Sequence, residues 1–259
     1  MSCHLKLLRV SRRILAVFAC ALMLQGLASA QDLAEDLVAY WPLDDDFNDQ
    51  VGDFDGEGFG SSDIEFGPGK FGNGIVLDGE DQYVEIVGGD IDGLDFVDEG
   101  SMSISAWFRV DAFDTSWQAL IAKGEQDAWR LHRNAGNCGM AFTAGEPDVT
   151  SGICVNDGEI HHVVATSLEG EKTIYIDGEW AADGFQDPIG VPNTNNRVRI
   201  GDNPSTNNRE WEGLIDDVAI WGRALTEDEV GEIWAGGEAG ASIGDLVGLP
   251  PGLLGDYNN

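Results

Sequence analysis

The chain has 259 residues, and its 47 acidic side chains against 14 basic ones give a formal charge of −33. Such a surface repels phosphate groups, which excludes nucleic acids and anionic membranes as partners. Acidic surfaces keep exported proteins soluble, whereas grouped carboxylates also suit calcium, which takes about six to eight oxygen ligands. Both interpretations of the charge stay open at this point.

Residues 1–30 predict a secretory signal peptide. Four basic residues precede the apolar run 14–24, and Ala28-Ser29-Ala30 provides the small side chains of a cleavage site. The apolar run is too short to span a bilayer. A lipoprotein anchored through Cys20 is disfavoured because the bulky Phe18 occupies a position that prefers small residues. We therefore expect cleavage after Ala30 and a secreted, extracellular protein.

Two cysteines remain after signal removal, Cys138 and Cys154. An oxidising compartment favours a disulfide between them. The segment 145–148 between them is typical of a hairpin turn, and closing a loop of about 15 residues contributes roughly 3 kcal/mol. Two buried free thiols are the alternative, and two cysteines alone do not make a metal site.

Residues 37–221 contain short apolar runs separated by glycine. In the segment 103–110, Ile104, Ala106, Phe108 and Val110 occupy every second position and should share one face. Residues 172–176 and 179–182 flank Asp177-Gly178 and predict a hairpin. Asp-Gly turns occur at 55–56, 78–79, 92–93, 157–158, 177–178 and 183–184. Many short strands with tight turns predict an all-β fold, a two-sheet antiparallel β-sandwich.

One short C-terminal helix is predicted after the strands. Thr226 and Glu229 form a capping box, and Leu225 and Val230 occupy the positions of a hydrophobic staple. Val230, Ile233 and Trp234 share a face, and Gly236-Gly237 should end the helix. We therefore expect the sandwich to occupy residues 31–237.

Residues 238–259 are rich in Gly, Ala, Pro and Leu, which predicts a linker. Asp256 and Asn258 have the spacing that opens a calcium loop of the Asp-x-Asn type. This end is similar to the first residues of a dockerin-type repeat cut short. Two ligands alone do not hold calcium.

Four segments together carry a family resemblance: 37–44, 71–86, 103–108 with 161–178, and 213–226. In order and spacing they resemble the concanavalin A-like, laminin G-like jelly-roll domains of bacterial secreted proteins, across residues 36 to 236. Ile160 departs from the pattern, since the family usually carries Trp before the two histidines. The resemblance implies two antiparallel sheets and often one calcium ion near the chain ends. Family members bind carbohydrates or other proteins, so the fold alone does not settle function.

Calcium is the sharpest site hypothesis. Asp44, Asp45, Asp46 and Asp49 crowd one loop, and the resemblance implies that Asp216 and Asp217 lie close to it. The expected ligands are Asp44, Asp49, Asp216 and Asp217, completed by backbone carbonyls, and the ion would be structural. The alternative is that these carboxylates are simply solvated.

Catalysis is not expected. His161 and His162 should point to opposite faces of a strand, one buried in the sandwich and one exposed, and neither has a nucleophile in a recognisable turn. Glycoside hydrolysis needs two held carboxylates, and no Glu-x-Asp-x-x-Glu run occurs. Glu210 and Glu212 share a face but lack the remaining groups.

Carbohydrate binding would use aromatic rings near loops. Trp117, Trp129, Trp180 and Trp211 lie in or beside predicted loops, whereas Trp107, Trp221 and Trp234 suit the core. We select Trp129, Arg130 and Trp211 as the expected ligand contacts. The predicted function is a non-catalytic extracellular recognition module that binds glycans, with a cell-surface or structural interaction domain as the alternative and a hydrolase as the weakest candidate.

Overall fold

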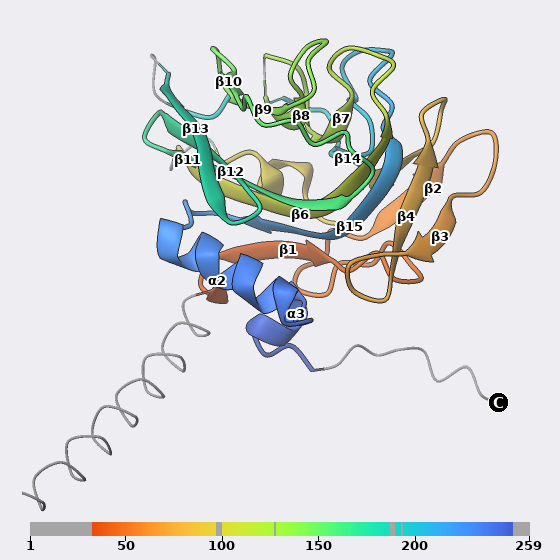
Figure 1. Cartoon of the computed structure of the whole chain (residues 1–259), viewed down its shortest axis with the longest axis horizontal. Coiled ribbons are helices and arrows are strands. Elements are labelled where there is room, and N and C mark those ends of the chain that lie inside the picture. The colour runs from red at the N-terminus through yellow and green to blue at the C-terminus, as the bar shows by residue number, and fades with distance from the viewer. Residues whose placement is uncertain (1–32, 97–99, 127, 187–189, 193, 251–259) are drawn as a thin grey trace, which may run out of the picture.

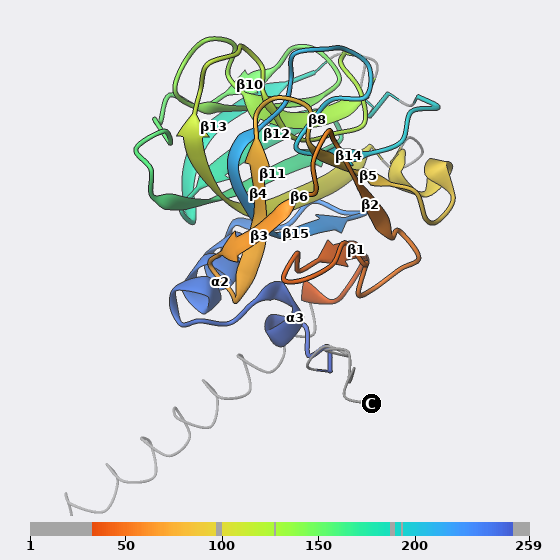
Figure 2. The same cartoon turned by 90° about the vertical axis from the view of Figure 1, so that its right-hand side faces the viewer.

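The computed structural model describes residues 33–96, 100–126, 128–186, 190–192 and 194–250. The expected signal peptide and the pair Asp256 and Asn258 lie outside the described residues. Within the described part, two antiparallel sheets pack face to face, as Figures 1 and 2 show from two directions. The predicted all-β sandwich is therefore confirmed.

Sheet A contains eight of the described strands. In spatial order they are β13 (Glu179–Phe185), β12 (Glu171–Ile176), β11 (Ile160–Leu168), β6 (Ser101–Ala112), β15 (Glu212–Trp221), β4 (Asn73–Asp78) and β3 (Glu65–Pro68), with β1 (Leu37–Trp41) paired to the far end of β15. The long central strands β6 and β15 form the floor of the sandwich in Figure 1.

Sheet B contains seven of the described strands. Their order is β10 (Val149–Thr150), β9 (Met140–Ala144), β8 (Trp129–Arg133), β7 (Ala119–Ala122), β14 (Arg199–Ile200), β5 (Tyr83–Ile86) and β2 (Gly56–Phe59). A short 3-10 helix, η1 (Ile91–Leu94), follows β5. The face of sheet B that points away from sheet A is called its outer face below.

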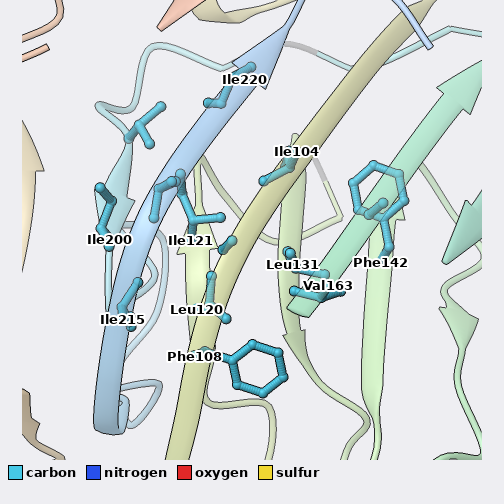
Figure 3. Packing of buried hydrophobic residues seen from close by; sticks show 14 of the residues in the cluster. Ile104, Phe108, Leu120, Ile121, Leu131, Phe142, Val163, Ile200, Ile215 and Ile220 are labelled. Carbon is cyan, nitrogen blue, oxygen red and sulfur yellow. The ribbon is translucent and has the colours of Figure 1, made fainter. Parts of the chain in front are cut away.

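The core fills the space between the two sheets. The predicted inward face of β6 is confirmed, because Ile104, Ala106, Phe108 and Val110 are all buried in one cluster. Figure 3 shows Ile104 and Phe108 together with side chains from both sheets, among them Leu120, Leu131, Phe142, Ile215 and Ile220. Each fully buried aliphatic or aromatic side chain contributes roughly 1.5–3 kcal/mol.

Helix α2 (Glu227–Glu238) covers the outer face of sheet A. It begins with the predicted capping box between Thr226 and Glu229. Trp234 stacks on Trp107 of β6, with 5.2 Å between the ring centroids. A Cβ at position 237 would lie 2.2 Å from the Trp107 ring, so Gly237 is required by the close approach of helix and ring. This glycine lies inside the helix, where the sequence suggested a stop.

The segment after α2 differs from the linker expected at 238–259. Residues Ile243–Leu246 form a second short helix, α3, capped by Ser242. Ile243 is buried against the outer face of sheet A, and its N–H donates to Asp217 Oδ2 at 3.1 Å. The composition predicted a linker because small residues dominate, but Ile243, with Leu246, Val247 and Leu249 packed beside it, docks the segment. No helix in the described residues is both long and apolar enough to cross a bilayer.

Candidate functional site

The carboxylate of Asp49 organises the loop after β1, where the sequence suggested a calcium ligand. Each of its oxygens accepts two backbone hydrogen bonds, at 2.9–3.1 Å, from the N–H groups of Tyr40, Val51, Gly52 and Phe54. Both oxygens are therefore occupied by protein donors. These bonds give Asp49 a structural role that needs no ion, and its expected role as a calcium ligand stays a prediction.

Asp217 is likewise committed to protein partners. It is buried, it accepts a hydrogen bond from the Tyr40 hydroxyl, and its second oxygen accepts the Ile243 N–H. Burial raises the pKa of Asp217 to about 7, against the lowering effect of the Tyr40 hydrogen bond. Asp217 therefore holds α3 against β1, and its expected role as a calcium ligand stays a prediction.

Asp216 and Asp44 remain from the expected calcium set. Asp216 Oδ2 accepts the N–H groups of Lys70 and Phe71 at 2.7 and 3.0 Å, whereas its buried Oδ1 has no partner among the described residues. Burial, with Asp217 and Asp44 adding repulsion, raises the pKa of Asp216 to about 8. Asp44 Oδ1 accepts the Asn73 N–H at 2.9 Å. Both carboxylates thus hold the same β3–β4 turn.

A cavity of about 430 Å³ opens beside this turn, between the loop after β1 and the segment that follows α2. Its lining includes five acidic residues, Asp44, Asp45, Asp46, Asp217 and Asp245, together with one basic residue, Lys70. Within the described residues, no group of three or more His, Cys, Asp or Glu side chains is arranged to hold a metal ion. Asp216 does not line this cavity, so a cation between Asp44 and Asp216 would lie beside it and would need backbone oxygens as further ligands.

The structure places two of the three expected glycan contacts in the core. Trp129 and Trp211 are fully buried. The Trp129 indole N–H donates to Leu94 O at 2.7 Å, and Trp211 packs edge-to-face against Phe108 at 5.7 Å. A ring enclosed on all sides has no free surface for a sugar, so these two predictions are wrong.

Arg130, the third expected contact, lies on the outer face of sheet B. It follows Trp129 on β8, and neighbouring residues of a strand point to opposite faces. Its guanidinium pairs with Glu125, lies 3.5 Å from Asp148 Oδ1 and donates to Thr143 Oγ1 at 3.2 Å. Arg130 is itself buried, so it organises the loops above the sheet and offers little surface of its own.

The polar network around Arg130 continues along the outer face. Burial, with Arg130 beside it, lowers the pKa of His132 to about 3, so this imidazole is neutral near pH 7. Glu125 Oε1 accepts hydrogen bonds from Arg209 Nε and Asn203 Nδ2, each at 3.2 Å. The network thus joins β8 to the β7–β8 and β14–β15 connections.

Three loops meet at one end of this network, and we call them the Trp117 loop cluster. They comprise residues 113–118, 134–139 and 203–210, which connect β6–β7, β8–β9 and β14–β15. The Trp117 N–H donates to Ala135 O at 3.0 Å, and the Arg209 guanidinium lies 5.4 Å from the centre of the Trp117 ring. In Figure 1 the β6–β7 and β14–β15 connections run together above sheet B at the upper right.

Each loop of the cluster contains a non-glycine residue in the left-handed conformation. Trp117, Ala135 and Asn208 have φ angles of 60°, 46° and 58°. Such conformations are uncommon, most of all for a bulky residue, and cost on the order of 1–3 kcal/mol each. Trp117 nevertheless stays 39% exposed. Contacts elsewhere in the fold must therefore offset the cost of the left-handed backbone conformation that holds Trp117 at the surface.

The predicted disulfide anchors the same cluster. Cys138 and Cys154 are bonded, and the Val155 N–H donates to Cys138 O at 2.9 Å. The expected hairpin lies between the two cysteines, with Val149 of β10 opposite Phe142 of β9. Both contacts tie Cys138 of the loop 134–139 to the connection between β10 and β11.

The sequence indicated Trp117 as a loop residue but did not select it. Its partners, Ala135 and Arg209, come from segments far apart in the chain, and no local spacing relates them. One available signal was the pair of amide-rich runs, 134–137 and 207–208, which suit surface loops.

The fold and the loops gathered over one sheet define a two-sheet jelly roll with a loop-built surface. The chain belongs to the concanavalin A-like lectin/glucanases superfamily, whose laminin G-type model matches residues 78–231.

A curated relative is the calpain-type cysteine protease ADL1 of Oryza sativa subsp. japonica. It is 31% identical over 140 residues, which is 44% of this chain, and the match spans only 6% of the relative's length. This likeness therefore concerns one small part of that protein.

Two solved structures share the fold. Domain 4 of AbnA, a GH43 extracellular arabinanase from Geobacillus stearothermophilus in complex with arabinotriose, is 22% identical with a TM-score of 0.61, covering 76% of this chain and 98% of that domain. The binding domain of botulinum neurotoxin DC in complex with SialylT is 14% identical with a TM-score of 0.62, covering 79% and 52%. At these identities the likeness establishes the fold alone.

Proposed function

We propose that this chain is a non-catalytic, extracellular carbohydrate-binding module that binds glycans on the Trp117 loop cluster. The ring of Trp117 is the platform for the apolar face of a sugar. Arg209 and the exposed amides of Asn137, Asn207 and Asn208 supply hydrogen bonds to sugar hydroxyls around it.

The observation that carries the proposal is an exposed tryptophan held in a strained backbone conformation. A large aromatic ring in water is unfavourable, and a left-handed φ adds to the cost, so the position is best explained by contact with a ligand. The amides beside it are both donors and acceptors, which matches the hydroxyl groups of sugars. Two proteins of the same fold were solved with the bound ligands arabinotriose and SialylT.

The same network argues against glycoside hydrolysis. Glu125 and Asp148 are carboxylates of this network, and both contact the Arg130 guanidinium. Hydrolysis requires one carboxyl group to protonate the leaving oxygen and another to act as nucleophile or base. Carboxylates bound to a buried arginine are held in place for structure, which supports a binding role.

We also propose a structural calcium ion between Asp44 and Asp216. The buried, unpartnered Oδ1 of Asp216 supports this, since a buried oxygen without a donor is costly unless a cation satisfies it. The ion would tie the β3–β4 turn to β15. Export through the signal peptide at 1–30 would bring the protein to a compartment rich in calcium and compatible with the disulfide.

The test is glycan binding by the chain from residue 31 to 259, in calcium, on an array that includes arabinan oligosaccharides and sialylated glycans. Wild-type protein should bind at least one class, and Trp117→Ala should weaken that binding about tenfold or more. Phe59→Ala is the matched control, because Phe59 is 38% exposed on β2, outside the cluster. Circular dichroism and thermal melting establish that each variant is folded.

Equal affinity of the Trp117→Ala variant and the wild type would refute the site. A folded wild-type protein that binds no glycan would refute the proposed function itself. Retention of binding in Trp117→Phe would support stacking, since phenylalanine keeps a flat ring without the indole N–H.

A further inference from the structure

The three most exposed large hydrophobic side chains of the described residues gather at one margin of sheet A. Leu168, Trp180 and Phe185 are 51%, 55% and 56% exposed, whereas the other exposed large hydrophobics range from 37% to 41%. Isolated exposed hydrophobics are ordinary, but a group of three on one margin marks an interaction site. All three lie far along the sheet from β3 and β4.

Strand register places the three side chains on one face. Leu168 of β11 pairs with Glu171 of β12, and Glu171 pairs with Phe185 of β13. Trp180 pairs with Tyr175, which is four residues after Glu171 on β12 and therefore on the same face. The apolar side chains are thus spread over about 10 Å across the strands and about 13 Å along them. We call this surface the β13 face.

Helix α2 covers the neighbouring part of the sheet but stops short of the β13 face. Val164 and Tyr175 are buried in the cluster that contains Val230 and Ile233 of the helix. β13 is the last strand of sheet A, and in the described residues it pairs only with β12. Figure 1 shows it at the outer left margin. The face and its free strand edge therefore both point to solvent.

The charges around the β13 face all have one sign. Glu169, Glu171, Glu179 and Asp183 are exposed, and none of the four is ion-paired within the described residues. The nearest cation in sequence, Lys172, is buried on the opposite side of β12, where its ammonium donates to Gly145 O and Pro147 O. A partner must therefore bring apolar side chains and its own positive charge.

We propose that the β13 face docks an extended, basic segment of another protein, with apolar side chains against Leu168, Trp180 and Phe185 and basic ones against the surrounding carboxylates. Charge complementarity selects this occupant. The free edge of β13 offers backbone hydrogen bonds to a strand, which a glycan does not use in this way. A second copy of this chain would set Glu171 and Asp183 against like charges.

The docking does not depend on glycan binding, because the β13 face lies on sheet A and the Trp117 loop cluster lies over sheet B. The two proposals therefore fail independently. A glycan would also need hydrogen-bond donors beside the rings, such as the amides near Trp117, whereas carboxylates surround Trp180 and Phe185.

The test measures, by isothermal titration at low and physiological salt, the binding of a synthetic decapeptide of alternating Lys and Val to the chain 31–259. A decapeptide of alternating Glu and Val is the charge-reversed control. We expect the basic peptide alone to bind, more weakly as salt rises. The double variant Trp180→Ser with Phe185→Ser should weaken binding about tenfold, as should Glu171→Lys with Asp183→Lys.

The matched control is Glu57→Lys with Phe59→Ala on β2, the edge strand of sheet B, which removes the same kinds of side chain and should leave the affinity unchanged. Equal binding by all variants, no binding of the basic peptide, or equal binding of both peptides would each overturn the proposal. So would self-association of the wild type that is lost in Trp180→Ser with Phe185→Ser. Glycan binding lost in that same variant would also overturn it.

Discussion

Replacing Asp49 by Ala tests whether this carboxylate is a structural anchor or a metal ligand. The substitution removes the acceptor of four backbone N–H groups. The Tyr40 N–H lies in a buried strand and loses its partner at a cost of about 2 kcal/mol, and the three partly buried N–H groups, which water reaches, add about 0.7 kcal/mol each. The free energy of unfolding should therefore fall by about 4 kcal/mol.

The assay is thermal and urea unfolding with and without a calcium chelator. A loss of about 4 kcal/mol corresponds to a fall in Tm of about 10 °C in a domain of this size. Because the anchor needs no ion, the difference between wild type and Asp49→Ala should be the same in chelator. Asp46→Ala is the control, since Asp46 is exposed and, among the described residues, binds only Asn48; it should change stability by less than about 0.5 kcal/mol. A difference that vanishes in chelator would refute the anchor and support Asp49 as a calcium ligand.

Three further predictions concern calcium, pH and the disulfide. Chelation should lower the Tm of the wild type but should not change the Tm of the Asp216→Asn variant. An equal fall in both Tm values would show that any bound ion lies away from Asp216. Burial lowers the pKa of His132 and His162 to about 3. Between pH 6.5 and 3, both histidines are therefore protonated in the unfolded chain but neutral in the folded chain. Stability should be complete above pH 6.5 and fall by up to about 1.4 kcal/mol per pH unit for each histidine as the pH drops toward 3; urea unfolding at pH 7 and 5 measures it, and His162→Gln should show about half the loss. Replacing Cys138 and Cys154 by Ser, 16 residues apart, should cost about 3 kcal/mol in denaturant unfolding, and no loss would contradict the entropic argument.

The strands and the helix start were accessible from the sequence because their signals are local. Alternation in 103–110 fixes which side chains of β6 enter the core, and Asp177-Gly178 joins β12 to β13 as predicted. Thr226 and Glu229 lie within one helical turn, so their capping box is visible in the sequence alone. Strand alternation, the Asp-Gly turn and the capping box each depend on residues close together in the chain, so the sequence alone predicts them.

The burial of the tryptophans is harder to predict from the sequence. A shift of one residue in the register of a strand exchanges the side chains that face the core with those that face outward. Trp129 and Arg130 are neighbours on β8, and the first enters the core while the second faces outward. Nothing in the surrounding residues fixes where β8 begins. Trp117, Trp129 and Trp211 all lie in or beside predicted loops, and this proximity does not determine which of the three is buried.

The histidine pair shows the same limit from another side. Opposite faces were predicted, and His162 is indeed buried while His161 is partly exposed. The buried one, however, lies on the outer face of sheet A, stacked 4.6 Å from Trp107 under α2, and not inside the sandwich. The alternation of residues along β11 predicts that the two histidines lie on opposite faces of the sheet. It does not predict that α2 covers the outer face of sheet A and buries His162 there.

The docked segment after α2 brings the two ends of the domain together. Leu33, before β1, and Ile243 of α3 belong to one buried cluster, and Leu249 packs against it. The Trp221 indole N–H also donates to Leu33 O at 2.8 Å. Neighbouring ends allow a domain to be inserted into a loop of a host protein without separating the host's two halves. A circular permutant that joins residue 250 to residue 33 and opens the chain at the exposed turn 157–158 should therefore fold to the same sandwich.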